Sequence, residues 1–508
     1  MVGLPGVSHR TPIHHPNLVV TRTQAPVKER MLYCISGIAP QVNLRANSAD
    51  INTLETALCT RMYTCEVDGE YIEPPLPSRT MVNERMKNFK RKLCTFHSSP
   101  ETPQQVVEYY SGSKRRVYEQ ACLTLLGSPV NRRDAESVSF VKLEKVPPNK
   151  APRCIQPRNP RYNLELGRYI KHIEHRLYKQ VAKVFGDGPT IMKGYNVQEI
   201  GRIINGKWNT FKEPVAVGLD ATKFDMHVSP AMLSWEHSVY TTIFRNDPHL
   251  RKLLRWQMYN VGRGYCADGK LKYSVTGKRF SGDMNTALGN CLIMCGMIHA
   301  YLEARGIKGK LVNNGDDCVV FLEQADLADF QRGLEEWFLE VGFRMVAELP
   351  VFSIQEIEFC QMHPIKTVNG WTMVRNIPKA MAKDALCLLP IRNQKELQEW
   401  MGAVGECGMS ITKGVPVLSA FYAAYARNGT NKTRFGESLF MNSGVRFLRT
   451  GHLSQEEEIT DESRYNVWKA WGILPDHQVA LEKYFATMVV EFSREVASDY
   501  STVPSLLM

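Results

Sequence analysis

The clearest alternation of apolar and polar residues predicts short strands in the middle of the chain. Two apolar, β-prone runs flank the sequence NNGDD at residues 313–317, which predicts a hairpin with two adjacent carboxylates at its tip. The apolar run of residues 214–219 predicts a buried strand that leads directly into Asp220. Residues 265–275 alternate on both sides of the dipeptide Asp268-Gly269, which predicts a second hairpin.

Helical periodicity describes much of the remaining chain. Residues 85–93 combine one apolar face with an opposite basic face, and residues 106–126 predict helical structure around a Ser-Gly-Ser break. Residues 325–341 predict an amphipathic helix. Beyond about residue 379 the pattern is mainly helical to the end.

Two other segments lead to specific expectations. Residues 1–47 show little periodicity and are interpreted as an extended, partly ordered arm. Residues 357–362 and 371–375 are expected to form a strand pair across the turn at Asn369-Gly370.

The charge of the chain favours a polyanionic partner. Its 508 residues include 63 basic and 52 acidic ones, which gives a net charge of +11. A basic soluble protein without such a partner is the alternative. The 13 cysteines are scattered, as expected for reduced thiols in a cytosolic protein. A zinc site at Cys59, Cys65, Cys94 and His97 is a further alternative, although the gap between Cys59 and Cys65 is too wide for a standard zinc knuckle.

No uninterrupted apolar run approaches the roughly 18 residues that cross a bilayer. The longest, residues 291–302, is interrupted by Gly296 and His299 and is interpreted as a buried helix. The first residues lack the apolar region of a signal peptide. We therefore expect a cytosolic chain with no transmembrane segment of its own, which reaches membranes only through a partner.

Residues 140–168 carry a dense set of basic side chains between five prolines. The prolines hold the segment extended, so it cannot be a basic helix. A stiff basic hairpin is suited to gripping a triphosphate or a nucleic-acid backbone. A disordered loop is the alternative, but interspersed apolar residues favour packed strands. Five of the basic residues in this segment are Lys142, Lys145, Lys150, Arg153 and Arg158.

Carboxylates and small residues mark three further positions. Asp316 and Asp317 repel each other unless a cation lies between them, and a hard divalent ion with oxygen ligands fits best. Asp220 lies at the end of a buried strand with Asp225 five positions on, a plausible arrangement of a metal ligand and a substrate ligand. The small-residue loop that begins at Ser281 brings backbone amides close to a ligand. The alternatives are a surface turn, an N-capping aspartate and a glycine turn before a helix.

Four sequences in order carry a family resemblance: KAPRCIQPRNPRYNLELGRY, GLDATKFDMHVS, SGDMNTALGNCLIM and NNGDDCVVF. They resemble motifs F, A, B and C of the RNA-dependent RNA polymerases of positive-strand RNA viruses. More closely, the chain is similar to the replicases of the tombusvirus–carmovirus–umbravirus group of plant viruses. The resemblance covers roughly residues 80–490, and the four motifs together are highly specific.

This resemblance implies an α+β fold in the form of a closed right hand, with an antiparallel palm sheet and a mainly helical thumb. Residues 357–362 would form the strand under the primer end. The implied divisions are an arm at residues 1–47, fingers at 48–213 with the basic loop 140–168, a palm with part of the fingers at 214–378, and a thumb at 379–508.

The resemblance also implies the site. Asp220 and Asp316 would hold two Mg²⁺ ions, with Mn²⁺ as a substitute, and Asp317 would be a weaker or outer ligand. The five cations named above would surround the triphosphate and RNA, with Arg153 the foremost candidate. The nucleotide and its sugar would be recognised by Asp225, Ser281, Thr286 and Asn290.

The implied activity is replication and transcription of a positive-strand viral RNA genome from template RNA and ribonucleoside triphosphates. The implied location is host cytoplasm, at membrane-bound replication complexes reached through an auxiliary replicase protein. A reverse transcriptase is a rival, but it normally carries an aromatic residue at the position of Asp225. A non-catalytic RNA-binding protein is the other rival, and it would need neither carboxylate cluster.

Overall fold

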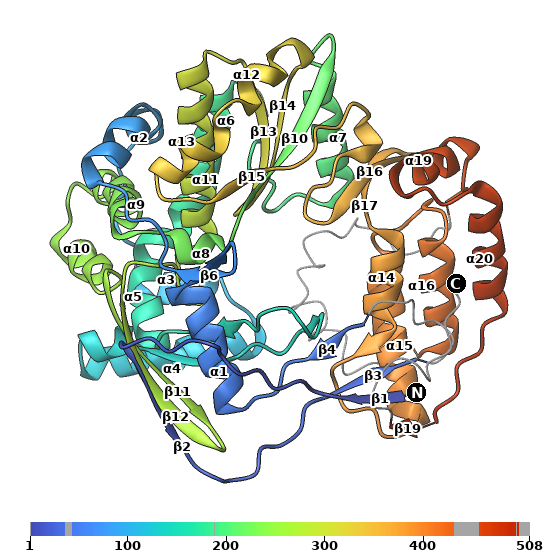
Figure 1. The fold of residues 1–508 in the computed structure, drawn as a ribbon, viewed down its shortest axis with the longest axis horizontal. Helices are drawn as coiled ribbons and strands as arrows, with labels where there is room; N and C mark the ends of the chain where they lie inside the picture. The colour runs from blue at the N-terminus through green and yellow to red at the C-terminus, as the bar shows by residue number, and fades with distance from the viewer. Residues whose placement is uncertain (1, 36–42, 187, 431–456, 494, 497–508) are drawn as a thin grey trace.

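The computed structural model describes residues 2–35, 43–186, 188–430, 457–493 and 495–496. The chain combines helices with several small sheets, most of them antiparallel. In Figure 1 the elements form a ring, with the last helices on one side and a four-stranded sheet at the top. The fold is therefore a mixed one, as the α+β expectation requires.

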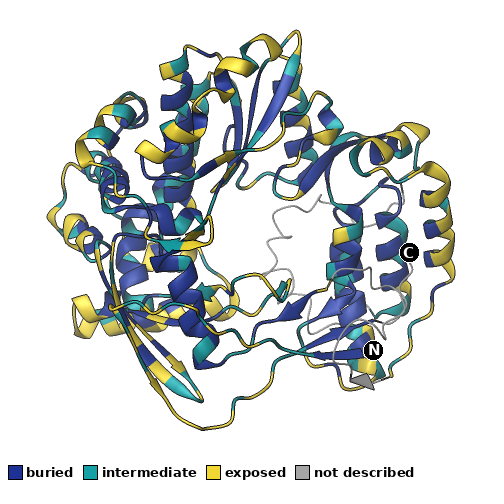
Figure 2. Cartoon of the chain, in the orientation of Figure 1, coloured by how far each residue is buried: buried dark blue, intermediate teal, exposed yellow. Residues whose placement is uncertain are grey.

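The four-stranded sheet is antiparallel throughout and is buried on both faces. Along its second-last strand, Val215 and Val217 join the largest hydrophobic core, whereas Ala216 joins a smaller core on the opposite face. This explains the continuous apolar run of that strand. Figure 2 shows the sheet and the long helix α11 (Thr286–Arg305) as largely buried. The strand order is β13 (Lys310–Asn314), β14 (Asp317–Glu323), β10 (Pro214–Ala221) and β15 (Met345–Ala347).

The predicted central hairpin and basic helix are confirmed. Strands β13 and β14 pair from Lys310 with Phe321 to Asn314 with Asp317. Helix α2 (Arg79–Leu93) buries Val82, Met86, Phe89 and Leu93, because these recur on one helical face. The region around the Ser-Gly-Ser break forms two helices, α3 (Pro103–Glu108) and α4 (Gly112–Gly127).

A five-stranded sheet contains the second predicted hairpin. Its second and third strands pair from Tyr259 with Thr276 to Cys266 with Gly269, which confirms the hairpin. The turn itself consists of Ala267 and Asp268, one residue earlier than expected, because Gly269 already pairs in the second strand of the hairpin. The N-terminal arm contributes one edge strand. The order is β2 (Leu18–Arg22), β12 (Gly269–Thr276), β11 (Tyr259–Cys266), β7 (Ser137–Val141) and β9 (Cys154–Ile155).

The rest of the arm pairs with distant parts of the chain. Strands β1 (Val2–Pro5) and β3 (Met31–Cys34) form a sheet with β18 (Leu386–Cys387) and β19 (Glu495–Val496). Strand β4 (Arg45–Ala46) pairs with β8 (Lys145–Val146). The arm thus connects the five-stranded sheet to the C-terminal part, although residues 36–42 lie outside the described structure.

Three other expectations are wrong in detail. Residues 160–168 are not extended, because Pro160 occupies the first position of helix α5 (Pro160–Ile170), where its missing N–H costs nothing. Residues 357–360 form no strand, and the observed pair is β16 (Met362–Thr367) with β17 (Gly370–Arg375). Positive φ angles of 52° at Cys360 and 59° at Gln361 make a tight turn there instead.

The third correction concerns residues 325–341, which form two helices rather than one. Gly333 adopts a φ of +66° and separates α12 (Leu327–Gln331) from α13 (Leu334–Glu340). Left-handed backbone ends a helix, and glycine adopts it without steric cost.

The C-terminal part is mainly helical, as predicted, and has its own hydrophobic core. Large buried side chains such as Trp400, Phe421 and Phe485 pack at its centre. Its helices are α14 (Ile377–Asp384), α15 (Gln394–Met409), α16 (Leu418–Asn428), α19 (Asp461–Trp471) and α20 (Pro475–Thr487).

Within the described residues, α11 is the one helix with the length and apolar composition of a membrane span. Of its most apolar window, 78% is buried inside the protein, which is typical of a core helix.

Candidate active site

The fold brings three acidic residues to one end of the four-stranded sheet. Leu219 pairs with Cys318 across neighbouring antiparallel strands, so Asp220 at the end of β10 lies beside the start of β14. Asp316 lies in the turn before β14, and Asp317 begins that strand. The turn is closed by the Asn313 side chain, whose Nδ2 donates to the Gly315 carbonyl at 2.7 Å.

These carboxylates influence one another electrostatically. Burial raises the pKa of Asp316, and the nearby charge of Asp220 raises this pKa further. Burial also raises the pKa of Asp317 to about 6, with a contribution from Asp316. Mutual repulsion of this kind is relieved by a bound cation.

The carboxylates fit a magnesium site of few protein ligands. In the described part of the chain no group of three or more histidine, cysteine or acidic residues is placed to hold a metal by itself. Asp317 is partly engaged, because one carboxylate oxygen accepts from the Cys360 backbone N–H at 2.9 Å. Asp220 and Asp316 both reach solvent, although the protein packed around the Asp316 carboxyl still desolvates it in part. Mg²⁺ commonly binds one or two carboxylates together with water and substrate phosphates, so this pair fits it.

The described residues give no support to the zinc alternative. Cys59, Cys65, Cys94 and His97 do not form a metal-binding group among the described residues. Cys94 instead lies 3.8 Å from the Val239 carbonyl, measured from its Sγ, and burial raises its pKa to about 11. A zinc ligand would need that thiol as a thiolate.

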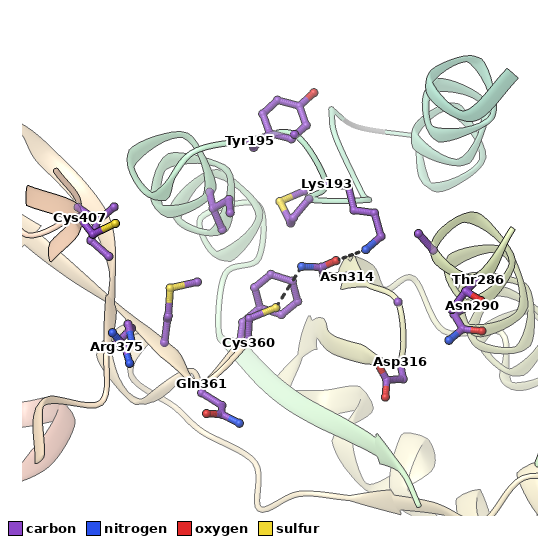
Figure 3. Close-up of a pocket in the computed structure, with 18 of the residues that line it drawn as sticks. Lys193, Tyr195, Thr286, Asn290, Asn314, Asp316, Cys360, Gln361, Arg375 and Cys407 are labelled. Carbon is purple, nitrogen blue, oxygen red and sulfur yellow. Dashed lines mark hydrogen bonds between the residues drawn. The ribbon is translucent and has the colours of Figure 1, made fainter. Parts of the chain in front are cut away.

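Two cavities meet at Asp316 and Ser281, which line both of them. The larger has a volume of about 1020 Å³ and the smaller about 180 Å³. Figure 3 shows Asp316 in the larger cavity, with Asn290 and Thr286 on the helix opposite. A side chain that lines both cavities can contact one ligand in the larger cavity and another in the smaller one.

Residues from distant parts of the sequence form the larger cavity. Lys193 donates to the Asn314 side chain at 2.7 Å, and the Asn314 amide in turn lies 3.5 Å from the Cys360 sulfur (Figure 3). The opposite wall includes Arg375 at the end of β17 and Cys407 on helix α15 of the C-terminal part. The cavity therefore runs between the four-stranded sheet and the C-terminal helices.

The smaller cavity is strongly basic. Two acidic residues, Asp225 and Asp316, face a set of cations that suits a triphosphate. Sequence patterns did not indicate a role for Arg61, Lys223, Lys278 or Arg279, because these residues lie outside the basic segment at residues 140–168. The six basic lining residues are Arg61, Lys142, Lys223, Arg153, Lys278 and Arg279.

The five basic residues predicted to surround the triphosphate have different environments. Lys142 and Arg153 line the smaller cavity, and both pair with Glu144. The Nζ of Lys145 donates to the Lys383 carbonyl and thus connects β8 to helix α14. Lys150 is exposed and lines neither cavity.

Arg158, the fifth, lines neither cavity and is held by contacts inside the protein. Its side chain is 1% exposed and forms a buried ion pair with Asp283. It also donates to the Ala135 carbonyl at 2.7 Å and to the Asn260 side chain at 2.8 Å. All three guanidinium nitrogens of Arg158 thus donate to groups of the protein itself.

The four predicted sugar-binding residues converge only in part. Asn290 Nδ2 donates to Asp225 Oδ1 at 3.0 Å. Ser281 Oγ accepts from the Gln156 N–H at 3.2 Å, and Thr286 Oγ1 donates to the Phe280 carbonyl at 2.7 Å. Ser281 therefore joins the basic segment to the loop before α11, and it lines the smaller cavity together with Asp225.

Close packing fixes this loop. A Cβ atom at Gly282 would lie 2.6 Å from Pro157 Cα and 2.7 Å from the Gln156 carbonyl oxygen. Only glycine allows this approach without a shift of the backbone. The small-residue loop thus positions the basic segment against the start of α11.

Comparison with known proteins gives the family. A family model described as viral RNA dependent RNA polymerase matches residues 18–493. The RNA-directed RNA polymerase of Melon necrotic spot virus is 39% identical over 487 residues, which are 94% of this chain and 61% of the relative. That of Maize chlorotic mottle virus is 37% identical over 99% of this chain and 52% of the relative.

The RNA-directed RNA polymerase of Tomato bushy stunt virus is 38% identical over 95% of this chain and 60% of the relative. The chain thus spans between about half and three fifths of the length of these relatives. The resemblance indicated by the four motifs is confirmed. This chain belongs to the viral RNA-dependent RNA polymerase family.

Proposed function

We propose that this chain is the catalytic part of an RNA-directed RNA polymerase that replicates and transcribes the genome of a positive-strand plant virus. The observation that carries the proposal is the position of Asp316. It lies beside Asp220 at the end of the sheet and lines both the large cavity and the small basic one. A polymerase needs this arrangement, because the end of the RNA and the nucleotide must meet at one point.

The proposed reaction is nucleotidyl transfer. The 3′-oxygen of the RNA bonds to the α-phosphorus of a ribonucleoside triphosphate, the bond from that phosphorus to the β-phosphate oxygen breaks, and pyrophosphate leaves. Two Mg²⁺ ions, with Mn²⁺ as a substitute, would activate the hydroxyl and neutralise the leaving charge when bound by Asp220 and Asp316. Asp317 serves as an outer ligand, held in place by the Cys360 amide.

Two basic residues of the smaller cavity, Arg153 and Lys142, bind the triphosphate in this proposal. Arg153 and Lys142 exchange their partner Glu144 for phosphate oxygens, which accept the same charge-assisted hydrogen bonds. Asp225 and Asn290 recognise the ribose, since one accepts and the other donates a hydrogen bond.

The hand divisions follow from the same proposal. Residues 214–378 form the palm with part of the fingers, residues 48–213 the fingers, and residues 379–508 the thumb. The bond from Lys145 to Lys383 and the strands of the arm at residues 1–47 close the hand. The antiparallel sheet that carries the aspartates and the helical C-terminal core support this division.

The proposed partners are template RNA, ribonucleoside triphosphates and an auxiliary viral protein that recruits the polymerase to membranes in the host cytoplasm. Membrane flotation of the chain expressed with and without the auxiliary protein tests this part of the proposal.

The central experiment is RNA synthesis by the purified chain with an RNA template, four ribonucleotides and Mg²⁺. We expect template-dependent product from the unaltered chain and synthesis slower by about a hundredfold or more from Asp316→Asn. Synthesis that depends on deoxyribonucleotides would indicate a reverse transcriptase instead. A chain that binds RNA but makes no product with any nucleotide or metal would contradict the proposal.

A further inference from the structure

A buried chain of hydrogen bonds extends from the proposed ribose site into the protein core. Asn290 uses both ends of its amide, since Nδ2 donates to Asp225 and Oδ1 accepts from Arg279 Nε at 2.9 Å. Arg279 in turn forms an ion pair with Glu236, and both side chains are 0% exposed. Glu236 lies on helix α9 (Pro230–Ile243) and lines neither cavity.

Arginine fixes the orientation of the asparagine amide. A guanidinium has only donors, so it holds the amide oxygen of Asn290 toward itself. The amide NH₂ must then point toward Asp225 and the ribose position. If the amide rotated by half a turn, two donors would meet at Arg279 and two acceptors at Asp225.

Glu236 holds Arg279 in the position that this requires. One carboxylate oxygen pairs with Arg279, while the other accepts from Asn285 Nδ2 at 2.8 Å and from the Tyr240 hydroxyl at 2.6 Å. The carboxylate is therefore bound on both oxygens, as a buried charge requires. An ion pair this deep is rarely the most stable way to fill a core, which points to a positional role.

The packing of Gly289 supports the same role independently. A Cβ at this position would lie 2.2 Å from Glu236 Oε1 and 2.3 Å from Arg279 Nη2. The ion pair thus lies directly against the backbone of α11, one residue before Asn290. Helix α11 can carry Asn290 past the ion pair only because the preceding residue has no side chain.

We infer that Glu236 and Arg279 are positioning residues for sugar selection: they set the orientation of Asn290, and through it the hydrogen bonds offered to the nucleotide 2′-hydroxyl. The inference rests on the proposed polymerase function. Discrimination against a sugar that lacks a hydroxyl depends on polar groups that are fixed in place and left unpaired by the wrong substrate. If Arg279 no longer holds Asn290, the Asn290 amide can rotate. The free-energy penalty for binding a nucleotide without the 2′-hydroxyl then becomes smaller.

The test compares incorporation efficiency of matched ribo- and deoxyribonucleotides on one template. Glu236→Gln keeps the shape of the side chain but removes the charge, and we expect the ratio of the two efficiencies to fall by about threefold or more. Arg279→Lys keeps the charge but not the bond from Nε to Asn290, and we expect a similar fall. Glu236→Asp, which restores the charge, should recover part of the ratio.

Glu482→Gln is the matched control. It breaks a partly buried ion pair with Arg464 in the C-terminal part, far from the sugar site in the fold. We expect it to leave the ratio unchanged, even if it lowers stability. This control separates a specific effect on sugar choice from a general loss of folding.

Epistasis provides the decisive readout. In an Asn290→Ala background, Glu236→Gln should cause no further fall in the ratio, because the residue that it positions is gone. Equal losses with both sugars, or additive losses in the double variant, would overturn the inference. If Glu236→Gln does not fold, Arg279→Lys decides by the same criteria. If the unaltered chain makes no RNA, the proposed function fails instead.

Discussion

The carboxylate of Asp317 accepts a hydrogen bond from the backbone N–H of Cys360, 2.9 Å away. Its neighbour Asp316 lines both cavities. Two adjacent aspartates in one hairpin thus have different surroundings, because the tight turn at Cys360 and Gln361 packs against only one of them. This difference leads to the first prediction.

Asp316→Asn or Asp220→Asn should slow nucleotide incorporation by about a hundredfold or more, the scale on which loss of one preorganised charge affects catalysis. Asp317→Asn should slow it by about tenfold or less, because the asparagine oxygen can still accept from Cys360. Single-nucleotide extension rates measure the effect, and RNA affinity by fluorescence anisotropy serves as the control. Normal rates in Asp316→Asn would remove the hairpin from the metal site.

Arg153→Ala should raise KM for all four ribonucleotides by the same factor, about tenfold on the scale of one charge-assisted hydrogen bond. Phosphate contacts carry no base information, so no nucleotide should be favoured. Steady-state kinetics with each nucleotide in turn measures this. An effect confined to one nucleotide would place Arg153 near a base.

Arg158→Ala, the same substitution five residues on, should act on stability. It would leave the buried carboxylate of Asp283 without its partner and lower the free energy of unfolding by about 3–5 kcal/mol. Denaturant unfolding of this variant beside Arg153→Ala measures the contrast. If Arg158→Ala is as stable as the unaltered chain but binds nucleotides weakly, the structural role is wrong.

Asp225→Ala should lose more rate with ribonucleotides than with deoxyribonucleotides. An unpaired polar group in a site built for a hydroxyl costs roughly 1–3 kcal/mol, so discrimination should narrow by about tenfold or more. Asn290→Ala should have the same effect more weakly. Competition between matched ribo- and deoxyribonucleotides measures the ratio, and an unchanged ratio in both variants would leave Asp225 as a structural carboxylate.

Sugar discrimination should also depend on pH. Burial raises the pKa of Asp225 to about 6, although the Asn290 hydrogen bond and the charge of Arg279 oppose this. Above pH 6 the group is an ionised acceptor, and below pH 6 it is increasingly protonated. We therefore expect the ribo-to-deoxyribo ratio to fall as the pH is lowered from 8 to 5. The ratio cancels effects of pH on steps that both nucleotides share, and it should be independent of pH in Asp225→Asn.

The sequence alone determined the features that depend on local chemistry. The apolar, β-prone runs around NNGDD predicted the hairpin, because strand propensity and turn residues act over a few positions. The apolar run before Asp220 predicted a buried strand, and the basic face of α2 followed from helical spacing. The four motifs in order identified the family that the comparisons confirmed.

Only the tertiary structure decided which of these residues act together. Arg153 and Arg158 belong to one basic segment. Arg153 lines a cavity, whereas Arg158 is buried in an ion pair with Asp283. The sequence cannot distinguish them, because burial depends on what distant segments pack against each position. Glu236 resembles any helical glutamate in the sequence.

The role that we assign to Glu236 comes from a contact across 43 positions with Arg279 and the absence of a side chain at Gly289. The incorrect prediction of a strand at residues 357–360 has a similar origin. The left-handed turn at Cys360 and Gln361 contains no glycine, and it is compensated by a hydrogen bond to Asp317 from another part of the chain. Local propensity does not include such a long-range bond, so the turn was visible only in the folded structure.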